Sequence, residues 1–201
     1  MLRSGSSAAT TALVSIAALL PVLAVYFTAT PSDELVSAPL PTAVVSDAVP
    51  TFDLAHVSDD VLWLARCIYS ETKREHEQEL VAWVVRNRVE TGYRGQSTYE
   101  SVVLDPYQFS AFNPGSSKRR LFTTLTPTSN SASFQQALEV AHAVYYAPST
   151  TRPFPKTTRH FYSERSMRGG RAPTWAEGER PVTPVKHRVD PKRFRFYSGL
   201  A

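Results

Sequence analysis

The sequence has a single cysteine, Cys67, so no disulfide can form within the chain. Cys67 lies in the apolar run 61–68, where we expect a small buried hydrophobe and not a reactive thiol. The fold must therefore be held by a hydrophobic core, which a composition of 42% apolar and 11% aromatic residues can supply. A length of 201 residues allows one ordinary domain with a tail, and not two full domains.

Charge is absent from residues 4–32, and this uncharged stretch is long enough to cross a bilayer. Residues 8–29 consist mainly of Ala, Leu, Val and Ile, and as a helix at about 1.5 Å per residue they would span roughly 33 Å. Arg3 precedes the stretch and acidic residues follow it, which favours an N-terminus in the cytoplasm and the remainder outside. We expect residues 1–30 to be an uncleaved signal anchor; a cleaved signal peptide, which would leave a secreted protein, is the alternative.

Residues 31–56 contain proline with Ser, Ala, Val and Thr, show no helical or strand period, and are interpreted as a flexible linker. The remaining segment, 57–201, is expected to be the working domain. It carries 21 of the 22 basic and 14 of the 18 acidic residues, a net charge of +7. Such a charge suits an anionic polymer, either nucleic acid, a membrane surface or a cell wall; a solvated basic face is the alternative.

The pattern within this domain predicts helices first and a small sheet last, an α+β fold. Apolar residues at helical spacing, with capping residues before them, predict helices over 59–71, 75–91, 97–104 and 133–147. Alternation predicts strands over 157–162 and 193–197, the second with a basic face and an apolar face. Residues 113–130 are expected to form a long loop.

Glu71 is the first candidate for catalysis. It ends an otherwise apolar helix, where the helix dipole and apolar neighbours both disfavour the charged carboxylate and raise its pKa. A carboxylic acid that stays protonated near neutral pH is what cleavage of a glycosidic bond requires. Taken alone, the local sequence also fits an ordinary surface glutamate at a fraying helix end.

Five segments, in order and at matching spacing across 62–197, resemble the SleB/CwlJ-type cell wall hydrolases, the family of spore-cortex-lytic enzymes. Their counterparts in the family are Leu-Ala-Arg followed by Glu-Ala-Arg-Gly-Glu, an apolar run closed by Asn-Arg-Val, Gln-Phe-Ser-Cys-Trp, His-Tyr with Pro-x-Trp, and Phe-Tyr. The segments here are Leu64–Glu75, Val81–Val89, Tyr107–Phe112, His160–Tyr162 with Pro173–Trp175, and Arg195–Tyr197. In place of Ala-Arg-Gly this chain has Thr72-Lys73-Arg74, without the glycine of the tight turn.

The resemblance implies a lysozyme-like helical domain, as in lytic transglycosylases, that needs no cofactor and acts on the glycan strands of peptidoglycan. Glu71 occupies the position of the family's general acid. In the transglycosylase reaction one carboxyl acts first as acid and then as base, whereas two-carboxylate glycosidases need a partner. Asp105 and Glu75 are the candidates for a second carboxylate if hydrolysis is the outcome.

The resemblance and the residue types together suggest substrate-binding residues around Glu71. Gln108, Ser110 and Asn87 can donate or accept hydrogen bonds to acetamido groups, with a buried structural bond as the alternative for Asn87.

The aromatic candidates include Tyr107, Tyr162 and Trp175, which can stack on sugar faces, whereas Phe109 is expected in the core. His160 can bind substrate or orient Glu71, or be a satisfied structural histidine.

Two other functions remain open. A metal-dependent amidase, cutting the bond between muramic acid and the peptide, would need clustered ligands, and the 5 histidines show no paired ligand spacing. A non-catalytic peptidoglycan-binding module is the second alternative. Lys118–Arg120 is a short basic run without a nucleic-acid-binding motif, so no nucleic-acid partner is expected. The histidine spacing gives no reason to expect a bound metal.

Overall fold

A computed structural model describes residues 49–200. Five α-helices and a two-stranded sheet are connected by short 3-10 turns in this part of the chain. The helices and strands are α1 (Asp59–Glu71), α2 (Glu75–Glu90), α3 (Tyr99–Leu104), α4 (Arg119–Thr123), α5 (Ala132–Tyr146), β1 (Thr158–Tyr162) and β2 (Arg195–Ser198).

Helix α1 begins and ends as its sequence dictates. The Ser58 side chain caps the N-terminus by accepting a hydrogen bond from the Val61 N–H, and Asp59 and Asp60 lie in the first turn, where the helix dipole favours acidic groups. Its apolar face is buried through Ile68, and the helix ends at Glu71. This end of α1 therefore carries the candidate carboxyl.

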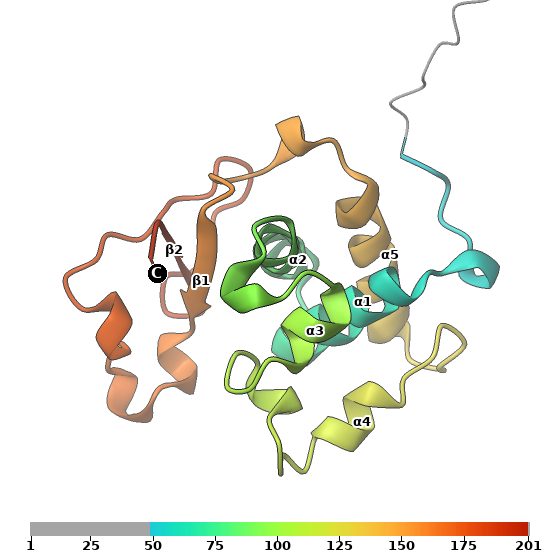
Figure 1. Ribbon diagram of the computed structural model, residues 1–201, viewed down its shortest axis with the longest axis horizontal. Helices are drawn as coiled ribbons and strands as arrows, with labels where there is room; N and C mark the ends of the chain where they lie inside the picture. The colour runs from blue at the N-terminus through green and yellow to red at the C-terminus, as the bar shows by residue number, and fades with distance from the viewer. Residues whose placement is uncertain (1–48, 201) are drawn as a thin grey trace, which may run out of the picture. The chain divides into compact units, whose positions relative to one another are not determined.

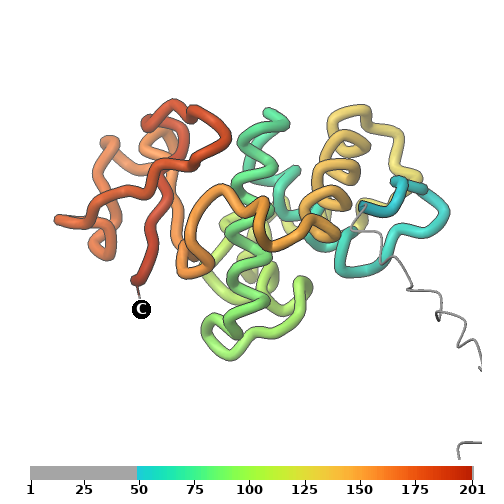
Figure 2. The backbone as a smooth tube through the Cα atoms, turned by 90° about the horizontal axis from the view of Figure 1, so that it is seen from above, coloured from blue at the N-terminus to red at the C-terminus, as the bar shows by residue number. Residues whose placement is uncertain are grey.

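Helix α2 is the centre of the domain. All its residues from Leu80 to Val85 are buried, because α1, α3, α5 and β1 surround it. Figures 1 and 2 show α5 on one side of α2 and the sheet with the C-terminal segment on the other. The continuous apolar run of α2, Leu80–Val85, covers all sides of the helix and is stable only in such an enclosed position.

The sheet is antiparallel, with His160 opposite Tyr197, Phe161 opposite Phe196 and Tyr162 opposite Arg195. Phe194 and Phe196 are buried in the main core, whereas Arg195 is only partly buried, which confirms the expected apolar and basic faces of the last strand. A second, smaller core consists of Tyr162, Ala176 and Tyr197 and stabilises the loop-rich segment after β1.

The α+β prediction is confirmed, and the four predicted helices and two strands are present with ends that differ by two residues or fewer. The expectation of a continuous loop over 113–130 is wrong, because α4 forms there. Phe122 buries its ring against Phe112 and Tyr69, and this packing stabilises a turn of helix too short to show a period in the sequence.

The C-terminal end of the predicted linker, residues 31–56, packs against the domain. Phe52 packs edge-on against His142 with ring centroids 5.3 Å apart, and a 3-10 turn follows at Leu54–His56. Packing onto the domain thus begins before residue 57. Residues 1–30 and most of the predicted linker lie outside the described residues; within 49–200 no helix is both long and apolar enough to cross a membrane.

Candidate active site

Glu71 lies in a cleft of about 390 Å³. One wall is formed by the end of α1 and the loop 107–113, and the other by Phe161, Tyr162 and the segment that follows β1. Glu71 is the one acidic side chain among the cleft-lining residues in the described part of the chain. The cleft therefore presents a single carboxyl to whatever occupies it.

Burial raises the pKa of Glu71 to about 7, and the charge of Arg88 opposes this rise without cancelling it. Arg88 is itself buried on α2, where its Nε donates to the carbonyl of Arg159 over 2.7 Å and its guanidinium lies 5.0 Å from the centre of the Phe109 ring. A carboxyl with this pKa is substantially protonated at neutral pH, so it can both give and take a proton.

Four of the residues expected to bind substrate line the cleft together with Glu71: Tyr107, Gln108, Ser110 and Tyr162. Tyr107 is 83% exposed and has a left-handed backbone with φ 66°, which is unfavourable for a tyrosine. Its N–H donates to the Asn113 side chain over 2.8 Å. The loop thus maintains a strained residue with an exposed ring at the rim of the cleft.

His160 and Trp175 lie beside the cleft and not among its lining residues. The Nε2 of His160 is hydrogen-bonded to the Tyr93 hydroxyl at 2.8 Å, and its ring is 5.2 Å from that of Trp175. Burial, with the charges of Arg88 and Arg159, lowers the pKa of His160 to about 4, so the ring is neutral at neutral pH. Trp175 is 38% exposed and contacts Tyr162 edge-on, with ring centroids 5.8 Å apart.

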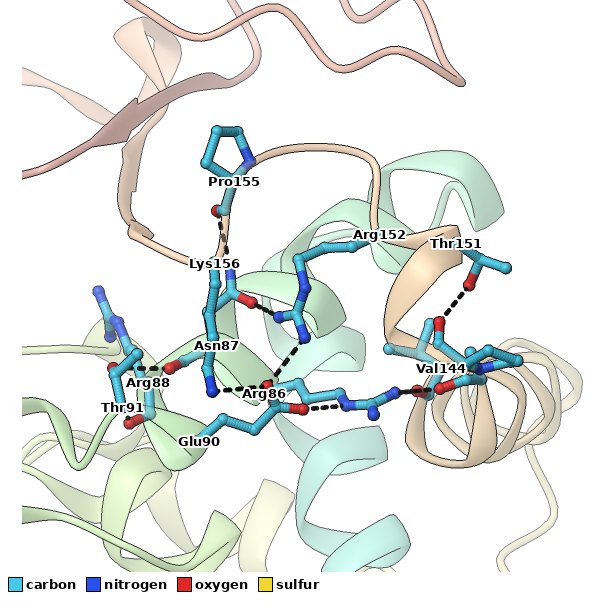
Figure 3. Close-up of polar contacts among 12 residues, drawn as sticks. Arg86, Asn87, Arg88, Glu90, Thr91, Val144, Thr151, Arg152, Pro155 and Lys156 are labelled. Atoms are coloured by element: carbon cyan, nitrogen blue, oxygen red, sulfur yellow. Dashed lines mark hydrogen bonds and ion pairs between the residues drawn. The ribbon is translucent and has the colours of Figure 1, made fainter. Parts of the chain in front are cut away.

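Asn87 lies outside the cleft, fully buried between α2 and the segment before β1 (Figure 3). Its Nδ2 donates to the carbonyl of Thr158 over 2.8 Å, and its Oδ1 accepts a hydrogen bond from Arg152. These contacts match the structural role considered for Asn87 and leave its amide no access to the cleft.

The two candidates for a second carboxylate also lie away from Glu71's cleft. Asp105 is buried and pairs with Arg94 at 2.6 Å, where it anchors the loop that carries Tyr107 and Gln108. Glu75 is exposed and lines a different hollow, between α2 and α5. Neither is placed to act on the same bond as Glu71.

Five polar cleft residues were not singled out by the sequence: Asn113, Ser163, Arg165, Ser166 and Arg193. Arg165 pairs with Asp190 at 2.8 Å, and Arg193 pairs with Glu77. Within residues 49–200 no three His, Cys, Asp or Glu side chains are grouped as metal ligands would be.

An α+β domain whose cleft holds one partly buried carboxyl with a pKa of about 7 defines a class of proteins suited to acid–base catalysis. The family model described as Cell Wall Hydrolase matches residues 72–189, more than half of the chain. This chain therefore belongs to the cell wall hydrolases of the SleB/CwlJ type. The match begins directly after Glu71, so the role of that residue depends on the cleft geometry.

Membership of the cell wall hydrolase family supports a hydrolase activity directed at peptidoglycan. No curated protein and no solved structure matches the chain.

Proposed function

We propose that this protein is a peptidoglycan glycosidase, and specifically a lytic transglycosylase that cuts between N-acetylmuramic acid and N-acetylglucosamine with Glu71 as general acid and base. The observation that carries the proposal is the single carboxyl in the cleft, with a pKa of about 7 caused by burial. We further propose that the helical core around α2 is a lysozyme-like fold.

In the first step Glu71, protonated, gives its proton to the bridging oxygen as the bond from that oxygen to the anomeric carbon breaks. The carboxylate then removes the proton from the 6-hydroxyl of the muramic acid residue, whose oxygen bonds to the anomeric carbon. The products are a free 4-hydroxyl on one fragment and a 1,6-anhydro end on the other, and Glu71 regains its proton. This cycle needs no second carboxylate, which agrees with the position of Asp105 and Glu75 outside the cleft.

Substrate binding is assigned to the side chains that share the cleft with Glu71. Gln108, Ser110, Tyr107 and Tyr162 line the cleft. In this proposal the first two hydrogen-bond acetamido groups and the two tyrosines contact sugar faces. Trp175 and the neutral His160 form the flank of this site, where we propose that they contact the substrate beyond the cleft or support Tyr162.

The proposed location is outside the cytoplasm, with residues 1–30 anchoring the protein in the membrane. The support for this is the uncharged apolar stretch after Arg3. A linker of this composition would let the domain reach roughly 25–30 Å into the layer beyond the membrane.

The test compares the purified full-length protein with its Glu71→Gln variant on isolated peptidoglycan, with the released fragments identified by mass spectrometry. We expect anhydro ends from the unmodified protein, unaffected by a chelator, and a loss of turnover on the order of 1,000-fold or more in the variant. Glu139→Gln, an exposed glutamate on α5, is the matched control and should retain activity. Fragments with reducing ends would show that the reaction is hydrolysis and not transglycosylation. Freed peptides, or full turnover by Glu71→Gln, would exclude the proposal.

A further inference from the structure

The connection between α1 and α2 is short and contains no glycine. Three residues, Thr72, Lys73 and Arg74, separate the end of α1 from the start of α2. Thr72 is the C-terminal cap of α1 and has an extended backbone, with φ −157° and ψ 159°. Glu71 is thus the last residue of a helix that ends without the glycine cap that commonly fixes such ends.

Every polar atom of Thr72 nevertheless has a partner. Its N–H donates to the carbonyl of Ile68 over 3.1 Å, and its carbonyl accepts a hydrogen bond from the Gln78 side chain at 2.9 Å. Its hydroxyl donates to Oε2 of Glu77 over 2.6 Å. The residue next to Glu71 is therefore fixed from three directions, two of them from the first turns of α2.

The acceptor of the Thr72 hydroxyl is a buried ion pair. Glu77 is 1% exposed, and Arg193 binds it with two nitrogens, Nε to Oε1 at 2.5 Å and Nη2 to Oε2 at 2.7 Å. Burial by itself would raise the pKa of Glu77, but the hydrogen bonds from Arg193 and Thr72 outweigh it, and the pKa lies below its ordinary value. A carboxylate buried in this way is retained only with such a bidentate partner.

Arg193 belongs to the opposite wall of the cleft. It lines the cleft together with Phe194, just before β2, and its Nη2 also lies 3.4 Å from the Thr72 hydroxyl. The Glu77–Arg193 pair therefore joins the wall that carries Glu71 to the wall formed by the C-terminal segment, directly beside Glu71.

We propose that Glu77 and Arg193 are positioning residues, which act through Thr72 to hold the Glu71 carboxyl inside the cleft. The inference rests on the proposed function, because it assigns to these residues the geometry of the same general acid. In the absence of a glycine cap, the ion pair takes over the fixing of the helix end. Glu77 itself is enclosed and touches no substrate.

Thr72→Val and Thr72→Ser in the full-length protein provide the first test. Valine keeps the shape but removes the hydroxyl, whereas serine keeps the hydroxyl. We expect kcat on soluble glycan fragments to fall on the order of 10- to 100-fold in Thr72→Val and to be restored in Thr72→Ser, because a small displacement of a catalytic group is costly. Equal kcat in the two variants would contradict the inference.

The pH profile supplies a readout that a purely structural tie would not change. The titratable or charged groups near Glu71 are Cys67, Arg88, and the cleft residues Tyr107, Tyr162, Arg165 and Arg193. If Glu71 is released toward water in Thr72→Val, its pKa falls toward the ordinary range, and the alkaline limb of the kcat profile moves to lower pH. An unmoved limb would count against positioning.

The double variant Glu77→Leu with Arg193→Met separates positioning from stability. Replacing both charges by apolar groups of similar size should restore much of the thermal stability that either single change removes, while kcat stays low. Recovery of kcat together with stability would mean that the pair only stabilises the fold.

The matched control is Glu79→Gln. Glu79 lies one position further along α2 from Gln78 and also joins α2 to the C-terminal segment, through Lys186 and His187 at 2.7 Å each, without contacting Thr72. We expect Glu79→Gln to retain kcat and Glu77→Gln to lose it. An equal loss of kcat in the two variants would contradict the inference. Activity in Glu71→Gln would overturn the proposed function itself, whereas an inactive Glu71→Gln with fully active Thr72→Val overturns the positioning role alone.

Discussion

At the scale of single residues, the burial that makes Glu71 an acid also costs the protein stability. Its pKa is raised from 4.5 to about 7, so the folded protein holds a proton that the unfolded chain releases between these values. Stability is therefore greatest below pH 4.5 as far as this group is concerned and declines as the pH rises to about 7, by on the order of 3 kcal/mol.

The Glu71→Gln variant should reverse this cost. Glutamine stays neutral, so the variant should unfold at higher urea concentration than the unmodified protein at pH 8 and at a similar concentration at pH 4.5. Urea unfolding at the two pH values measures the difference. An equal effect at both values would show that the carboxyl is not desolvated.

The activity should depend on pH through the same group. Because the proposed acid must carry its proton, kcat should fall about tenfold for each pH unit well above 7. A pH–rate profile on soluble glycan fragments checks this. A plateau extending to pH 9 would remove Glu71 from the acid role.

Tyr107 should show a trade between stability and binding. Glycine tolerates φ 66° without strain, so Tyr107→Gly should increase the free energy of unfolding by about 1 kcal/mol while weakening glycan binding about fivefold through loss of the ring. Tyr107→Phe retains both ring and strain and should match the unmodified protein. Unfolding curves and binding titrations with the Glu71→Gln background measure the two effects, and unchanged binding by the glycine variant would exclude a platform role.

At the scale of elements, α2 and β1 are joined by the buried amide of Asn87. Replacing it by alanine removes its bonds to Thr158 and Arg152 and leaves their polar groups unpaired, at a cost of about 3 kcal/mol. We expect Asn87→Ala to lower the unfolding midpoint while kcat per folded molecule is retained. A lower kcat at unchanged stability would indicate that Asn87 acts on the substrate and not on the fold.

The elements with a clear period were predictable from sequence, and those held by tertiary contacts were not. Helices α1 and α5 have serine caps, and α1, α2 and α5 all have apolar residues over several turns, which determine them locally. Helix α4 depends on where Phe122 packs, and this information is not in its five residues. The same holds for the sites: the helix end and the family pattern single out Glu71 as a candidate, but they do not single out Glu77, because its partner Arg193 is 116 residues away.

Of the candidate site residues, Gln108 and Ser110 of the Gln-Phe-Ser segment line the cleft because a single loop brings both there. Asn87 and Asp105 have the right chemistry for a site but are used by Arg152 and Arg94, which sequence cannot show. A polar side chain in a promising motif is thus an insufficient predictor without knowledge of its partners.

At the scale of the whole molecule, the charge of residues 57–201 should govern attachment to the wall. A net charge of +7 attracts an anionic polymer, and salt screens this attraction, with a Debye length near 10 Å at about 0.1 M. Sedimentation of the Glu71→Gln variant with peptidoglycan should decrease several-fold between about 50 and about 300 mM NaCl. Binding that does not change with salt concentration would mean that the basic residues form a solvated face and do not attach the protein to the wall.

The two walls of the cleft differ in how they are built. One is the end of a helix packed into the main core, whereas the other, residues 163–193, has no strand or α-helix and is held by 3-10 turns, ion pairs and the small aromatic core. Loops of this kind tolerate changes in length and composition far better than packed helices do. We therefore expect selectivity among wall chemistries to diverge through residues 163–192, while Glu71 and its support, Glu77 and Arg193, remain constant.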